Sequence, residues 1–174
     1  EDQVYRSFRG QMDEARRLVA AGGFARAERH CTNALFFKTD YWEASYYRAV
    51  CRLELKRIED ALEDFQRAAL QNGTLTQANL NAGICFMRLG RPERALREFD
   101  RCLREKVPLA NAFIERAKAR IALGDRAGAL MDLARVIEGR GITVDDPVLV
   151  AYLRFRAEFE ESEGNDAAAL PDWD

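Results

Sequence analysis

The chain has 174 residues, of which 48% are hydrophobic and 32% are charged, a composition typical of a globular domain with a substantial core. Its net charge is −2 with acidic and basic residues interspersed, so the sequence offers neither the basic field that attracts nucleic acids nor a charged tail of one sign. No apolar run approaches the roughly 18 or more residues of a membrane span, and we expect no direct membrane insertion.

Apolar residues recur at helical spacing along most of the chain, and glycines or prolines separate the successive stretches. The expected helices cover about 3–21, 24–37, 41–55, 58–71, 76–89, 92–104, 109–123 and 126–138. Thr39–Asp40 and Asp125 are predicted caps, and Pro92 is expected in a first turn, where its missing N–H costs nothing. A longer loop leads to a predicted capping helix at 147–163 and a C-terminal tail at 165–174.

The dominant feature of the sequence is its period. A step of 34 residues separates Ala27, Ala61, Ala95 and Ala129. The same step relates three further columns, which are Ala15, Ala49, Gly83 and Ala117; Cys31, Phe65, Phe99 and Leu133; and Gly22, Lys56, Gly90 and Gly124. Four copies in register predict a stacked array of helix pairs. Lys56 stands in the turn-glycine column, so it must take a positive φ or end its helix differently.

This order of a small residue in a first helix, a turn glycine, and an alanine and a large apolar residue in a second helix resembles the tetratricopeptide repeat. The resemblance covers roughly residues 7–140 and is clearest from Ala82–Gly83 through Gly90, Pro92, Ala95 and Phe99 to Pro108. It implies an all-α fold, a right-handed α-solenoid (superhelix) of stacked antiparallel helix pairs. We expect one domain over 3–164, with repeats at about 8–39, 40–73, 74–107 and 108–141 before the capping helix.

The resemblance also implies that the first helices line a concave groove. Apolar residues dominate the positions expected to face it, with Arg16 and Lys118 towards its two ends. The candidate partner-binding residues are Met12, Arg16, Val19, Tyr46, Val50, Leu53, Leu80, Asn81, Ile84, Met87, Asn111, Ile114, Lys118 and Ile121. Such a groove favours a partner helix or an extended segment as its ligand. The alternative is that these residues form ordinary helix–helix core or are covered by the chain's own tail.

Some members of the family hold a C-terminal carboxylate with a clamp of Lys, Asn and Arg in these columns, as in adaptors of heat-shock chaperones. The clamp does not map onto this chain. Its leading Lys and Asn would fall at Met12 and Arg16, or one repeat later at Tyr46 and Val50. We therefore disfavour a C-terminal carboxylate as the ligand.

These patterns predict a non-enzymatic protein–protein interaction module that serves as an adaptor, chaperone or assembly factor of a larger complex. The sequence has no Gly-rich phosphate loop, HExxH or GxSxG, and we expect no cofactor and no metal. Acidic residues that alternate with arginines, as in Glu93–Arg94 and Glu98–Arg101, are predicted to form surface pairs. One alternative is a structural subunit that self-associates or docks through its solenoid ends or tail. An RNA-binding repeat is disfavoured by the net charge and the aliphatic groove.

The cysteines Cys31, Cys51, Cys85 and Cys102 lie in apolar columns without a CxxC pair, so we expect buried free thiols rather than disulfides or metal ligands. Free thiols mildly favour a reducing compartment. A cytoplasmic location is therefore expected, with a periplasmic or secreted location after removal of a signal peptide as the alternative. For the tail, the alternatives are a disordered end, docking of Leu170 and Trp173 on the same molecule, and exchange between molecules.

Overall fold

The computed structural model describes residues 2–104, 110–140, 150, 153–154 and 156–157. Across these residues all regular secondary structure is helical, as the all-α prediction requires. The chain forms two compact units, Glu1–Leu109 and Ala110–Asp174. The predicted capping helix at 147–163 falls largely outside the described residues, and the tail at 165–174 falls wholly outside them. The extent of a single domain over 3–164 stays a prediction.

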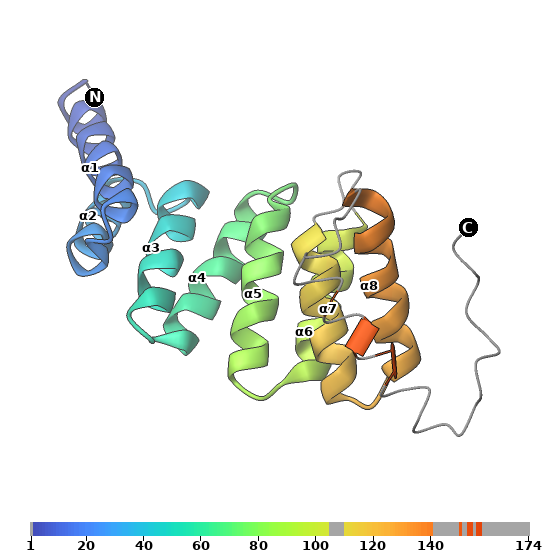
Figure 1. The fold of residues 1–174 in the computed structure, drawn as a ribbon. Coiled ribbons are helices and arrows are strands. Elements are labelled where there is room, and N and C mark those ends of the chain that lie inside the picture. Colours follow the sequence, from blue (N-terminus) through green and yellow to red (C-terminus); the bar gives the residue numbers. More distant parts are fainter. Residues whose placement is uncertain (1, 105–109, 141–149, 151–152, 155, 158–174) are drawn as a thin grey trace. The chain divides into compact units, whose positions relative to one another are not determined.

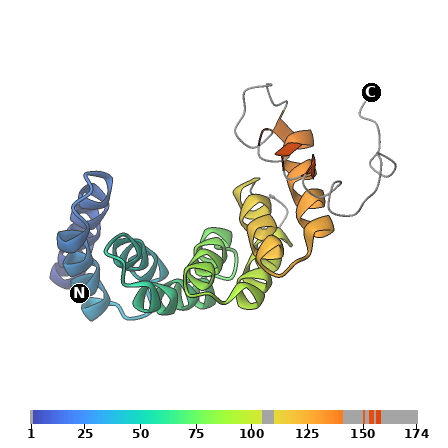
Figure 2. The ribbon, with the colours of Figure 1, turned by 60° about the horizontal axis from the view of Figure 1, so that its bottom comes forward.

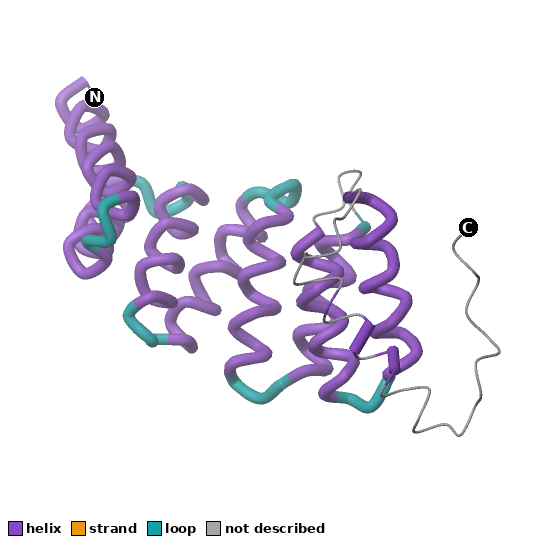
Figure 3. The backbone as a smooth tube through the Cα atoms, viewed as in Figure 1, coloured by secondary structure: helices purple, strands orange, loops and turns teal. Residues whose placement is uncertain are grey.

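In the first unit the described helices form three antiparallel pairs. They are α1 (Asp2–Ala20) with α2 (Phe24–Phe37), α3 (Trp42–Glu54) with α4 (Ile58–Gln71), and α5 (Thr76–Arg88) with α6 (Pro92–Leu103). Each of these helices also packs against the next one in the chain, so the pairs stack in chain order (Figures 1 and 2). Short loops join the helices (Figure 3). The stack of helix pairs expected of an α-solenoid is therefore present.

The second unit contains one described pair, α7 (Ala110–Ala122) with α8 (Arg126–Arg140). Its core brings Ala117 together with Ala129, Leu130 and Leu133. All eight helices start and end within a few residues of the predicted bounds. Within the described part of the chain, no helix is both long and apolar enough to cross a bilayer.

The columns that repeat every 34 residues form the core of each pair. The alanine column Ala27, Ala61, Ala95 and Ala129 is completely buried. Phe65 and Phe99 are also completely buried, and Leu133 is 7% exposed. Small residues recur at these positions because the two helices of a pair approach closely there, and a longer side chain would hold them apart. The period is thus a record of helix packing.

The turn between the helices of each pair uses one residue with positive φ. Gly22, Gly90 and Gly124 have φ of 75°, 67° and 80°, and Lys56 has φ of 63°. The predicted exception at Lys56 is therefore confirmed, and it takes the left-handed conformation instead of ending the helix differently. The same bonding pattern surrounds it, because the Arg57 N–H donates to Arg52 O at 2.8 Å as the Arg91 N–H donates to Phe86 O at 2.9 Å.

We expect Gly90→Ala to lower the free energy of unfolding by about 1 kcal/mol, because a Cβ is disfavoured at positive φ. A Cβ built on Gly90 meets no atom within 4 Å, so the effect isolates the backbone. Lys56→Gly is expected to act in the opposite direction and by less, about 0.5 kcal/mol, since glycine also gains freedom in the unfolded chain. Urea unfolding followed by circular dichroism measures both. A neutral Gly90→Ala variant would show that these turns adjust without strain.

Two of the three helix-start predictions are confirmed. Pro92 occupies the first turn of α6, and the Gly128 N–H donates to Asp125 Oδ1 at 2.9 Å, so Asp125 caps α8. The cap predicted at Thr39–Asp40 is wrong. The N-cap of α3 is Tyr41, which makes no side-chain capping bond. The chain enters α3 in an extended conformation at Tyr41, one residue beyond the polar pair, so their side chains do not reach the orphan N–H groups.

The surface placement predicted for the acidic residues of the second helices is wrong for part of them. Asp64 and Asp132 are 1% exposed and Glu98 is 7% exposed. Each lies on the side of its helix that faces the first helix of the pair, where Asp64 and Asp132 bind arginines. Arg48 donates to both carboxylate oxygens of Asp64 at 2.7 Å. These groups belong to the interior of the fold.

All four cysteines are buried as free thiols. Cys31 on α2 and Cys51 on α3 are neighbours, and the hydrogen bond between the two thiols together with burial raises the pKa of Cys31 above its ordinary value. Burial raises the pKa of Cys85 to about 11. These two thiols are therefore protonated near neutral pH, where a thiol is a poor nucleophile and a poor metal ligand.

Candidate partner-binding surface

Hydrogen bonds between successive pairs hold the first helices α1, α3 and α5 together. From α1, Arg16 Nε and Nη2 donate to Glu43 Oε1 on α3 at 3.0 and 2.7 Å. From α5, Asn81 Nδ2 donates to the Tyr46 hydroxyl on α3 at 3.2 Å. The candidate residues of these three helices therefore lie on one side of the first unit. We call this side the first-helix face.

The residues of this face differ in exposure. Met12, Leu53 and Leu80 are 1%, 9% and 3% exposed, so their side chains belong to the core, as the alternative in the sequence allows. The half-buried members are Val19, Tyr46, Val50, Asn81, Ile84 and Met87. These six side chains, together with Arg16, form the part of the first-helix face that a ligand can touch.

The remaining candidates lie on α7 in the second unit. Asn111 and Lys118 are exposed, Ile114 is half-buried, and Ile121 is 41% exposed. Lys118 Nζ donates to Glu115 Oε1 of its own helix at 2.7 Å. These residues give α7 a face of mixed apolar and charged character within its own unit.

The polar groups of the first-helix face are already engaged. Besides Glu43, Arg16 binds Asp13 Oδ1 at 2.8 Å, so it is not the isolated cation that the sequence suggests. Burial raises the pKa of the Tyr46 phenol, although the hydrogen bond from Asn81 acts in the opposite direction, and the hydroxyl stays protonated at neutral pH. Among the described residues no group of three or more His, Cys, Asp or Glu side chains could hold a metal ion.

A cavity of about 430 Å³ opens at the N-terminal end of this face. Its lining residues are Phe8, Arg9, Met12, Asp13, Arg16 and Tyr41. The rings of Phe8 and Tyr41 meet edge to face with centroids 4.8 Å apart. Sequence reasoning missed both aromatic residues, since neither belongs to a column that keeps its residue type every 34 residues.

Comparison with known proteins agrees with this architecture. Residues 12–74 match the family model of the tetratricopeptide repeat. No curated protein matches the chain. The matched segment spans α2 to α4 and the larger part of α1, and its helix pairs have the same packing as α5 with α6 and α7 with α8.

Solved structures with the same fold have little sequence identity to the chain. A tetratricopeptide repeat protein from Parabacteroides merdae superposes with a TM-score of 0.77 at 19% identity, over 91% of this chain and 64% of that one. The MamA protein gives 0.72 at 18% identity, over 95% and 98%. The second repeat domain of human RPAP3, solved with an HSP70 peptide, gives 0.64 at 20% identity, over 67% and 98%. At such identities the likeness establishes the fold.

Proposed function

Because the chain carries tetratricopeptide repeats, we propose that it is a non-enzymatic protein-interaction module whose ligand binds on the first-helix face. The observation that carries this proposal is the set of half-buried apolar side chains on α3 and α5, namely Val50, Ile84 and Met87. They lie beside the hydrogen bond between Tyr46 and Asn81, which holds the two helices together. A partner would cover apolar surface there without displacing a charged pair.

The chemistry of this face favours an apolar ligand over an acidic peptide terminus. The RPAP3 domain bound to an HSP70 peptide supports peptide binding as the class of activity for such a fold. In this chain, however, Met12 and Val50 stand where a carboxylate clamp needs polar groups, and Arg16 is paired with Glu43 and Asp13. An amphipathic helix or an extended segment with aliphatic side chains matches the face better. The role would be that of an adaptor, chaperone or assembly factor.

The test is to select peptides that bind the full chain from a random library and to measure their affinity for two variants. In Val50→Glu/Ile84→Glu, charges replace half-buried apolar groups of the first-helix face, while the core residue Leu80 stays in place. The matched control is Phe36→Glu on α2, because Phe36 is 84% exposed and lies outside this face. We expect the double variant to weaken binding about tenfold or more and the control to leave it unchanged.

Circular dichroism must show that the double variant keeps its helices, so that a loss of affinity reports the face. Equal affinities for the double variant and the parent would contradict the proposal. Light scattering of the free chain tests the alternative function. A dimer that dissociates in the double variant, with no selected peptide bound, would assign this face to self-association.

A further inference from the structure

Two helix pairs contain the same buried arrangement of two arginines and an aspartate. In α3–α4, Arg48 forms a two-pronged pair with Asp64, and Arg52 Nη1 donates to Asp64 Oδ2 at 2.8 Å. In α7–α8, Arg116 and Arg120 bind Asp132 in the same way. The equivalent residues are 68 apart, or two repeats. At this position of the fold, a buried carboxylate accepts hydrogen bonds from two guanidinium groups.

The pair between them, α5–α6, keeps the carboxylate and has no arginine on its first helix. Glu98 takes the place of Asp64 and Asp132, while Ala82 replaces Arg48 and Arg116, and Phe86 replaces Arg52 and Arg120. The Glu98 side chain is only 9% exposed. Its carboxylate contacts Arg101 of its own helix, whose Nη1 lies 3.0 and 3.2 Å from the two oxygens.

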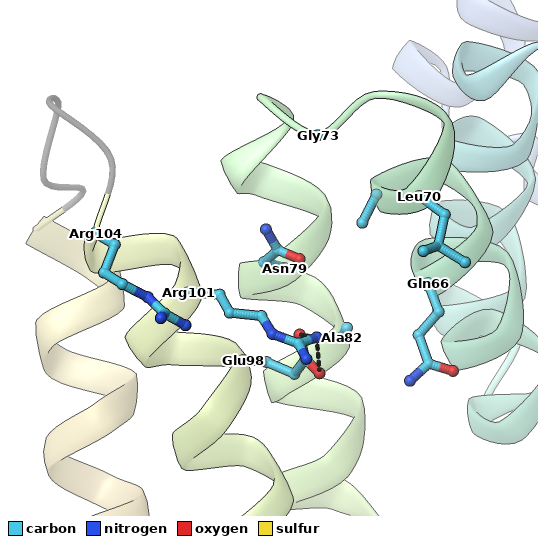
Figure 4. Close-up of a pocket in the computed structure, with 9 residues that line it drawn as sticks. Gln66, Leu70, Gly73, Asn79, Ala82, Glu98, Arg101 and Arg104 are labelled. Atoms are coloured by element: carbon cyan, nitrogen blue, oxygen red, sulfur yellow. Dashed lines mark hydrogen bonds and ion pairs between the residues drawn. The ribbon is translucent and has the colours of Figure 1, made fainter.

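The place of the missing arginine is a cavity of about 610 Å³. Ala82 and Glu98 line it from α5 and α6, and Ala69 and Leu70 line it from α4. Figure 4 shows Leu70 on the opposite side of the cavity from Glu98 and Arg101. Leu70 is 88% exposed, so the cavity is open to solvent beside an apolar wall. None of its lining residues belongs to the first-helix face.

We propose that this cavity binds an arginine side chain of a partner protein, with the guanidinium on Glu98 in the place that Arg48 takes on Asp64. An arginine suits the site because its aliphatic stem can pack on Ala69 and Leu70 while its head reaches the buried carboxylate. The site is a second contact surface, separate from the first-helix face, and does not depend on the function proposed for that face.

Arg101 leaves room for such a ligand. It offers a single nitrogen to the carboxylate, where Arg48 offers two, and its side chain is 58% exposed. Asp64 and Asp132 each accept two guanidinium groups at once, so Glu98 can keep Arg101 and accept a second one. A planar guanidinium that binds through two parallel N–H groups makes a stronger pair than a single contact. Arg101 and Arg104 also line the cavity, so an anion is the competing ligand that the experiment must exclude.

The probe is N-acetyl-arginine amide, titrated into the full chain and followed by amide chemical shifts in NMR spectra. Glu98→Gln keeps the shape of the side chain and removes its charge, and we expect the affinity to fall about tenfold or more. Ala82→Arg supplies the guanidinium from within the chain, as position 48 does, and should abolish binding. Glu93→Gln on the exposed side of α6 is the matched control and should bind as the parent does.

Two further probes give the specificity. N-acetyl-lysine amide should bind more weakly than the arginine derivative, because an ammonium cannot make the two-pronged contact. N-acetyl-aspartate amide should not bind. Unchanged arginine affinity in Glu98→Gln would overturn the proposal even if Ala82→Arg failed to fold. Binding of the aspartate derivative that is lost in Arg101→Gln would identify an anion site instead and would equally overturn it.

Discussion

Replacing Asp64 by Asn is expected to lower the free energy of unfolding by about 3 kcal/mol, which is the cost of removing one partner from a buried ion pair. The Asp64 side chain is 1% exposed, and those of Arg48 and Arg52 are 12% and 17% exposed. The two-pronged contact of Arg48 needs two acceptor oxygens. An amide offers one oxygen and one NH₂ group, so a donor would face a donor and part of the guanidinium would be left buried without a partner.

The matched control for this prediction is Asp60→Asn on the same helix. Asp60 pairs with Arg57 at 2.7 Å, but both side chains are nearly half exposed, so water can replace the contact and we expect no measurable change in stability. Urea unfolding of the full chain gives both values. Asp132→Asn should repeat the large effect in the second unit, because Arg116 and Arg120 bind Asp132. Equal and small losses for Asp64→Asn and Asp60→Asn would contradict a structural role for the buried pair.

These buried pairs also show where the sequence misleads. Arginine and acidic residues alternate along the second helices, and alternation alone predicts exposed pairs. The signal that identifies the buried ones is a relation between two helices: Arg48 and Arg116 are two repeats apart, and each precedes its aspartate by the same distance along the chain. Comparing the columns one at a time, as the period analysis does, cannot reveal a pairing between columns.

The fold itself follows from the sequence because helix packing repeats with the chain. Ala61 and Ala95 are buried to the same degree because the same helix crossing recurs around them. Turn residues are predictable for a similar reason, since every pair needs one positive φ, and Lys56 supplies it without being a glycine. Local geometry is therefore encoded position by position, and four copies make the code legible.

Exposure within the candidate surface is less predictable, because it depends on neighbours outside the repeat. Met12, Tyr46 and Leu80 belong to one column, yet Met12 and Leu80 are buried and Tyr46 is half-buried. Met12 packs in a cluster that includes Phe8, Tyr41 and Tyr47, and Phe8 and Tyr41 have no equivalents in the later repeats. The period thus places a residue on a face of a helix, whereas its accessibility is set by side chains that the period does not describe.

The closest helix approach in the chain has its own consequence. Gly83 on α5 faces the buried ring of Phe99 on α6, and a Cβ at position 83 would lie 2.3 Å from Phe99 Cε1 and 2.7 Å from Cδ1. The other repeats have alanine in this column, so the sequence alone suggests that alanine is acceptable at position 83. The geometry predicts the opposite, because Phe99 occupies the volume that the methyl group needs.

Gly83→Ala is therefore expected to lower the free energy of unfolding by about 1–3 kcal/mol, the usual range for overpacking a core. The control is Gly10→Ala in α1, where a Cβ meets no atom within 4 Å and alanine should stabilise the helix by about 0.5–1 kcal/mol. Phe99→Leu should relieve the clash, since α7–α8 combines Ala117 with Leu133. Adding Gly83→Ala to Phe99→Leu should then cost less than adding it to the parent. If both glycine variants stabilise the chain in urea unfolding, Phe99 can move aside and the contact does not limit helix packing.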